Sequence, residues 1–147
     1  MSPIESPPPS FSAQDALVAV MVAISVSDEN VSTNELLSIS RMVETLPVFE
    51  GYDRDRMRVV SQTVFDLLTE EDGLDALFGL VRDALPAGLR ETAYALACDV
   101  AAADGHAFQA ELQFLLELRH EMNVDRLHAA AIERGSAARH RRLPSGR

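Results

Sequence analysis

The stretch Asp104-Gly105-His106-Ala107-Phe108-Gln109-Ala110-Glu111 joins two apolar segments with helical periodicity. A second stretch, Asp28-Glu29-Asn30-Val31-Ser32-Thr33-Asn34-Glu35, has the same plan 76 residues earlier. In both, an aspartate ends one helical pattern, and a glutamate seven residues later begins the next. The recurrence predicts two copies of a helix–acidic turn–helix unit, related by an internal pseudo-symmetric repeat.

The acids of both turns continue rows of apolar residues at three- and four-residue spacing, which is the spacing of one helix face. The row before the first turn leads to Asp28, and its members are Leu17, Val20, Met21 and Ile24. The rows after the two turns match position by position: Glu35, Ile39, Met42 and Leu46, then Glu111, Leu115, Leu118 and Met122. We therefore expect Asp28, Glu35, Asp104 and Glu111 to lie in line with the core rather than on the solvent face.

The periodicity extends over the whole chain and predicts an all-α single domain of about seven helices, because no segment alternates as a strand would. The expected start signals are Ser12 with Asp15, Ser32 with Glu35, Asp53, Asp72, Pro86 and Asn123. The expected helices cover about 13–27, 32–46, 54–68, 73–85, 86–104, 108–122 and 124–138. The domain is expected at 12–138, between a flexible Pro/Ser-rich leader at 1–11 and a basic, flexible tail at 139–147.

Composition restricts the class of protein. The chain has 147 residues, 47% of them apolar, so it can bury a core, and its longest apolar run is too short to span a bilayer. The tail holds four positive charges, so the net charge of −10 leaves −14 on residues 1–138. Such an acidic body argues against nucleic acid as a partner and favours cations or basic protein surfaces. The lone Cys98 excludes an internal disulfide and is expected to be a small core residue.

The four acids suggest a metal site, because buried carboxylates need a compensating partner and hard cations prefer oxygen ligands. If the two units pack about a pseudo-twofold axis, Asp28, Glu35, Asp104 and Glu111 could converge on Ca²⁺, Mg²⁺ or Mn²⁺. Asn30 and Asp99 are candidate additional ligands. The spacing is not that of an EF-hand loop. His106 is expected to be exposed rather than a transition-metal ligand, since the first turn has Asn30 in its place.

A structural interpretation of the same acids stays open. A glutamate at the third helical position can complete a capping box and oppose the helix dipole, and Ser32 is in place to do so with Glu35. The protein would then be an interaction scaffold with acids used as helix caps. Enzymatic activity is not expected, because no nucleophile–base pair, phosphate-binding loop or cofactor fingerprint is present; we assign no catalytic and no cofactor-binding residue.

An alanine-rich helix that leads into Ala103-Asp104-Gly105, followed by Glu111 at the next helix, resembles the TerB family of tellurite-resistance proteins over about 13–138. TerB-like domains also include the N-terminal region of a membrane-anchored J-domain co-chaperone. The resemblance implies a helical stress-response domain with two similar halves, and metal binding by Asp28, Glu35, Asp104 and Glu111. The first turn departs from the pattern, since Glu29 replaces the expected Gly.

The resemblance also implies where the protein acts and with what. It implies protein partners in a cytoplasmic complex that is peripheral to the inner membrane. It does not fix the oligomeric state, for which a dimer is one option. Tellurite chemistry does not follow from the sequence, because direct reduction would call for thiols and the chain has a single cysteine.

Overall fold

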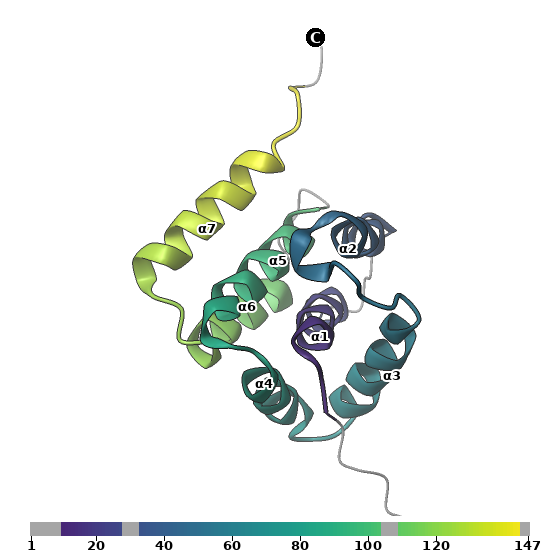
Figure 1. Ribbon diagram of the computed structural model, residues 1–147. Coiled ribbons are helices and arrows are strands. Elements are labelled where there is room, and N and C mark those ends of the chain that lie inside the picture. Colours follow the sequence, from purple (N-terminus) through teal and green to yellow (C-terminus); the bar gives the residue numbers. More distant parts are fainter. Residues whose placement is uncertain (1–9, 28–32, 104–108, 145–147) are drawn as a thin grey trace, which may run out of the picture.

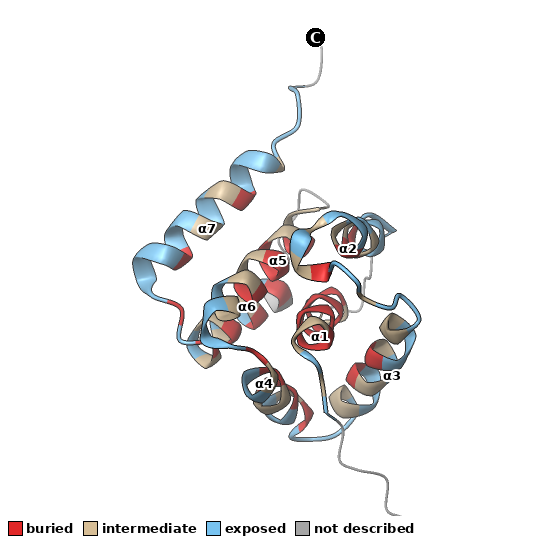
Figure 2. Cartoon of the chain, in the orientation of Figure 1, coloured by how far each residue is buried: buried red, intermediate tan, exposed pale blue. Residues whose placement is uncertain are grey.

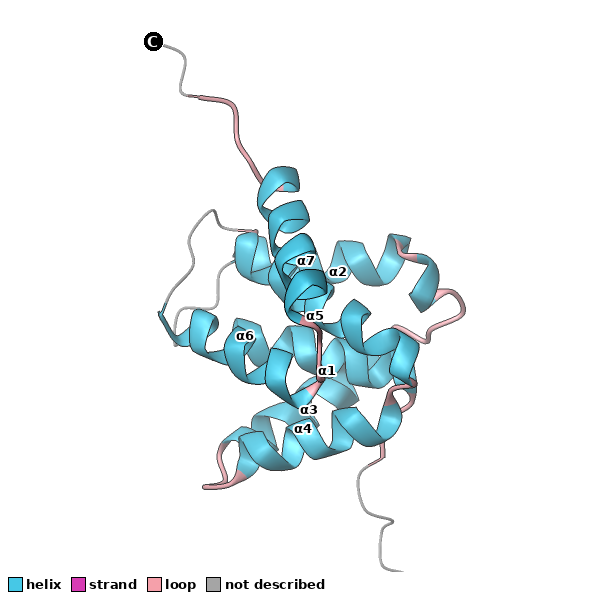
Figure 3. Cartoon of the chain, turned by 90° about the vertical axis from the view of Figure 1, so that its left-hand side faces the viewer, coloured by secondary structure: helices cyan, strands magenta, loops and turns pink. Residues whose placement is uncertain are grey.

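The protein is described here by a computed structural model in which residues 10–27, 33–103 and 109–144 are placed, apart from the side chains of 109 and 110. Helices are the only regular secondary structure in these ranges (Figure 3), which confirms the all-α prediction. There are seven α-helices: α1 Ala13–Ser25, α2 Thr33–Thr45, α3 Arg56–Leu68, α4 Gly73–Ala84, α5 Arg90–Ala102, α6 Gln109–Glu121 and α7 Arg126–Arg139. Two short 3₁₀ turns, η1 Pro47–Phe49 and η2 Ala87–Leu89, precede α3 and α5.

Helix α1 is the centre of the fold (Figures 1 and 2), and α2, α3, α4, α5 and α6 all pack against it. Residues 16–24 are at most 7% exposed, so every face of this stretch is buried rather than one stripe. A helix that is apolar all round is stable only when other elements cover it on all sides. This explains the long apolar run in this part of the sequence. The sequence predicted one buried stripe, formed by Leu17, Val20, Met21 and Ile24, whereas the structure buries the residues between them as well.

Small side chains let α1 and α5 pack closely. Ala93, Ala97 and Ala101 of α5 are all buried, and they meet a helix that carries Ala16, Ala19 and Ala23. Helices α2 and α6 each contact both members of this pair, whereas α7 packs on α5 at the edge of the molecule (Figure 1). The predicted repeats require two central helices flanked by α2 and α6, and the structure has this arrangement. The pseudo-symmetry itself stays a prediction.

Two expected helix starts differ from the structure, and a third has the expected position without the expected capping bond. Asp53 does not cap α3, because it organises the turn before it: its Oδ1 accepts from the Asp55 amide at 3.0 Å, and α3 begins at Arg56. Asp72 is the N-cap residue of α4, which begins at Gly73 as predicted, but its side chain makes no capping bond. The residues after Pro86 form η2, so that α5 begins only at Arg90.

Asn123 was also predicted wrongly, as the N-cap of the last helix. It has a φ of +54° and ends α6, since the left-handed conformation is the usual helix stop and Asn tolerates it. The amide of the following Val124 donates to the Arg119 carbonyl at 3.1 Å, which closes the turn. Asp125 caps α7 instead, and its carboxylate accepts from the amides of Leu127 and His128.

Candidate cation site

Glu35 and Glu111 are the third residues of α2 and α6, and each is only 1% exposed. The residues that follow them in the two predicted rows are buried or half-buried: Ile39, Met42, Leu46, Leu115, Leu118 and Met122. The glutamates therefore do lead core-facing rows, as their spacing indicates. Because α2 and α6 each pack on both α1 and α5, the two carboxylates are buried on helices that flank the same central pair.

The two aspartates of the hypothesis, Asp28 and Asp104, lie outside the described residues, as do Glu29, Asn30 and the 105–108 segment with His106. The described chain stops one residue before each aspartate and resumes at the helix that carries the glutamate. Within the described ranges, no group of three or more His, Cys, Asp or Glu side chains is placed to hold a metal ion. Convergence of all four acids therefore stays a prediction.

Asp99, the candidate additional ligand, is engaged elsewhere. Its carboxylate accepts a hydrogen bond from the Arg139 guanidinium at 2.7 Å and lies 3.9 Å from the His140 imidazole. The aspartate side chain is 17% exposed, so this pair joins the end of α7 to α5 near the surface. The contacts involve Oδ1 of the carboxylate, so Asp99 as an additional ligand stays a prediction.

A third buried acid, Asp15, has a structural role. With Ser12 it forms the predicted capping box of α1, and it also accepts hydrogen bonds from the Tyr52 hydroxyl at 2.8 Å and the Arg56 guanidinium at 2.9 Å. Burial alone would raise the pKa of Asp15, but the hydrogen bonds from Arg56, Ser12 and Tyr52 outweigh it and hold this pKa below its ordinary value. Burial together with the Asp15 charge raises the pKa of Tyr52, which stays a donor.

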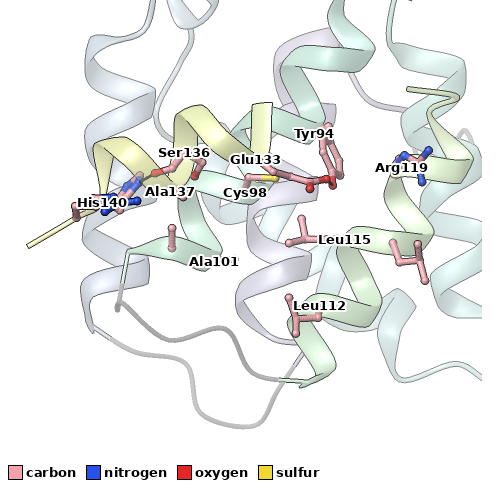
Figure 4. A pocket seen from close by; sticks show the side chains of 13 residues that line it. Tyr94, Cys98, Ala101, Leu112, Leu115, Arg119, Glu133, Ser136, Ala137 and His140 are labelled. Carbon is pink, nitrogen blue, oxygen red and sulfur yellow. Dashed lines mark hydrogen bonds between the residues drawn. The ribbon is translucent and has the colours of Figure 1, made fainter. Parts of the chain in front are cut away.

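The sequence did not reveal an open groove of about 740 Å³ that lies between α6 and α7. We call it the α6–α7 groove; its floor is α5 (Figure 4). It is lined by Tyr94, Cys98, Ala101, Ala102, Leu112, Leu115, Leu116, Arg119, Glu133, Ser136, Ala137, His140 and Arg141. One sequence signal was available: Leu112 and Leu116 are apolar but lie off the core-facing row of α6.

Two polar side chains of this groove are hydrogen-bonded to each other. The Tyr94 hydroxyl donates to Glu133 at 2.6 Å, and burial with this bond raises the pKa of Tyr94. Burial, assisted by the Glu133 charge, raises the pKa of Cys98 to about 12. The thiol is therefore neutral at physiological pH, as befits the small core residue expected at this position.

Fold and buried acids together define a class of protein: a seven-helix domain in which two glutamates, 76 residues apart, begin helices on either side of a central pair. Comparison with known families identifies the class. The chain belongs to the TerB family, because the sequence pattern described as "Tellurite resistance protein TerB" matches residues 14–134, most of the chain. No curated protein and no solved structure matches it.

Proposed function

We propose that this TerB-family domain is a non-enzymatic, tellurite-resistance-type stress-response protein that binds a divalent cation through its two acidic turns. Glu35 and Glu111 would supply buried carboxylate oxygens, and Asp28 and Asp104 would complete the ligand set from the adjoining turns. The observation that carries the proposal is the matched burial of the two glutamates at 1% exposure. Carboxylate oxygens are the ligands that hard divalent cations prefer, so two buried glutamates at matching positions would suit such an ion.

The charge of the molecule supports the same proposal. The protein carries a net charge of −10, and neither acidic turn contains an Arg or a Lys. A divalent cation bound by four carboxylates would lower the repulsion among them. Of the divalent ions, Ca²⁺, Mg²⁺ and Mn²⁺ fit an all-oxygen set best.

The test is calorimetric titration with each ion, together with thermal unfolding. An ion present at one hundred times its Kd should stabilise the protein by about 2.7 kcal/mol. Asp104→Asn, Glu35→Gln and Glu111→Gln should each abolish that shift. Asp83→Asn and Glu70→Gln are matched controls, since both side chains are exposed, and they should leave it intact. Wild-type protein that binds no ion at millimolar concentration would overturn the proposal.

A second candidate is an interaction scaffold whose acids serve only as helix caps. It is favoured by one observation: Glu35 and Glu111 both stand third in their helices, where a carboxylate opposes the helix dipole. The capping-box form of this role fits Glu35, which follows Ser32 by three residues, better than Glu111, which follows Phe108. This scaffold predicts that Glu35→Gln and Glu111→Gln lower the melting temperature by the same amount with and without metal. The two functions are thus separated by one comparison of melting curves.

For location, we propose a cytoplasmic protein that works with protein partners in a complex peripheral to the inner membrane. In the described residues, no helix has the length and apolar character needed to cross a bilayer. Family membership and the acidic surface support partner binding; they leave open whether the domain acts as a monomer or a dimer. Fractionation of native cells, with detection in the membrane pellet before and after a high-salt wash, tests peripheral association.

A further inference from the structure

We propose that the α6–α7 groove is a docking site for an amphipathic helix of a partner protein, with acidic residues at both ends of its apolar face. Helices α6 and α7 both pack on α5 and leave an open channel between them (Figure 4). This inference concerns a surface other than the acidic turns and does not depend on a bound cation.

The walls and floor of the groove suit a helix. Leu112 and Leu116 lie one turn apart on α6 and are 47% and 48% exposed, although both are large and apolar. The floor is built of small residues, Ala101, Ala102 and Cys98, which let another backbone approach closely. A helix laid into such a channel places side chains at i, i+3, i+4 and i+7 against these leucines.

Charge determines which helix fits. Arg119 lies at one end of the groove and His140 at the other, with Cys98 and Leu115 between them (Figure 4). Arg141 lines the groove beside His140. In a molecule with a net charge of −10, a groove lined by two arginines and only one carboxylate, Glu133, is locally basic. Acidic residues at both ends of the bound helix would complement it and favour association.

Two polar atoms lining the groove lack a protein partner. In the described structure, Ser136 Oγ and Arg119 Nε are buried with no hydrogen bond, and Ser136 is only 3% exposed. Buried polar groups are almost always hydrogen-bonded, so unpaired ones need an explanation. Both atoms are closed to solvent in this structure, so they do not decide which ligand the groove takes.

A lipid or fatty acid is the main competing occupant, and the geometry disfavours it. The groove is open along the leucines, so an acyl chain lying there would stay in contact with water. A helix would cover the leucines with its apolar face and present its own polar face to solvent. An amphiphile also carries a single head group, whereas basic side chains stand at both ends of the groove.

The experiment selects binders from a display library of 14-residue amphipathic helices with fixed leucines on one face and randomised polar positions, in the presence of EDTA. The expected winners carry Asp or Glu at both ends, bind more weakly at high salt, and shift the amide resonances of α6 and α7 in wild-type protein. Leu112→Asp should weaken their binding at least about tenfold, the effect of removing one anchor contact. Arg141→Glu should weaken it as well.

The matched control is Leu36→Asp. Leu36 stands in α2 where Leu112 stands in α6, and it is 53% exposed, but it does not line the groove. Binding that survives Leu112→Asp, or that Leu36→Asp weakens equally, would overturn the proposal. So would a selection without enrichment, or winners with basic ends. Wild-type protein that selects no helix but binds vesicles containing phosphatidylglycerol, dependent on Leu112, would assign the groove to lipid.

Discussion

Removing the charge of Asp15 should destabilise the protein by about 2–3 kcal/mol, because this carboxylate joins three segments of the chain. Asp15→Asn weakens the bonds from the Tyr52 hydroxyl, the Arg56 guanidinium and the Ser12 amide. Hydrogen bonds to a charged group contribute about 1.5–3 kcal/mol, and the part-buried Tyr52 bond lies at the lower end of this range. Arg56 is 42% exposed, so its share is below about 1 kcal/mol, and the capping bond adds about 0.5–1 kcal/mol.

Urea unfolding followed by circular dichroism measures this loss, and a double-mutant cycle divides it. Tyr52→Phe should couple to Asp15→Asn by about 1–2 kcal/mol, and Arg56→Met by less, since the tyrosine is the more buried partner. Asp75→Asn is the control: Asp75 is also third in its helix, α4, but it is exposed, and its loss should cost below about 0.5 kcal/mol.

The stabilisation of the folded state by Asp15 should also decrease as the pH is lowered. The pKa of the folded-state carboxyl lies below the ordinary value of 3.8, so its stabilisation is fully present above pH 3.8 and is lost as the pH falls through the folded-state pKa. The difference between wild type and Asp15→Asn should therefore be constant from about pH 5 to 7 and shrink below about pH 4. A variant as stable as wild type at pH 7, or a difference that grows in acid, would refute this account.

Two further predictions follow from local geometry. A Cβ on Gly73 would lie 1.6 Å from the Leu67 carbonyl oxygen, so Gly73→Ala must displace backbone and should destabilise the protein by more than about 1 kcal/mol. A Cβ on Gly79 would have no atom within 4 Å, so Gly79→Ala should instead stabilise the protein by about 0.5–1 kcal/mol. Thermal unfolding measures both effects. Equal effects would contradict the close approach of α3 and α4. Cys98, with its pKa raised to about 12, should react with iodoacetamide at pH 8 about a thousandfold more slowly than an ordinary thiol, as mass spectrometry can measure. Rapid labelling of the native protein would refute its burial.

Local signals predicted those parts of the fold that depend on residues close in sequence. Ser12 and Asp15 are three residues apart, and their capping box forms as expected. The rows led by Glu35 and Glu111 depend only on helical spacing, and both glutamates are buried. Helix starts failed where two polar residues competed, as Asn123 and Asp125 did: the backbone of Asn123 adopts the left-handed conformation, which a sequence pattern does not distinguish from a cap.

Features built from distant residues could not be predicted in this way. Tyr52 and Arg56 reach Asp15 from 37 and 41 residues away, and no pattern in the sequence pairs them. The all-round burial of α1 likewise depends on five other helices. The groove depends on α6 and α7 packing on the same helix, α5, without closing on each other, which is a property of tertiary structure alone.

Comparison of α6 with α2, its counterpart in the predicted repeat, assigns the two candidate functions of α6 to two different rows of residues. Its inward row begins with Glu111, and the corresponding row of α2 begins with Glu35, so the buried acid belongs to both copies. Its outward row is Leu112, Leu116 and Arg119, all lining the groove, whereas the corresponding residues of α2 are Leu36, Ser40 and Val43. Ser40 and Val43 supply neither the second leucine nor the basic end of the α6–α7 groove. A separate pocket of about 380 Å³ lies between α2 and the end of α7, where Leu37 and Arg41 face Arg139 and His140. The buried glutamates therefore occur at matching positions of α2 and α6, whereas the groove lined by Leu112 and Leu116 lies between α6 and α7.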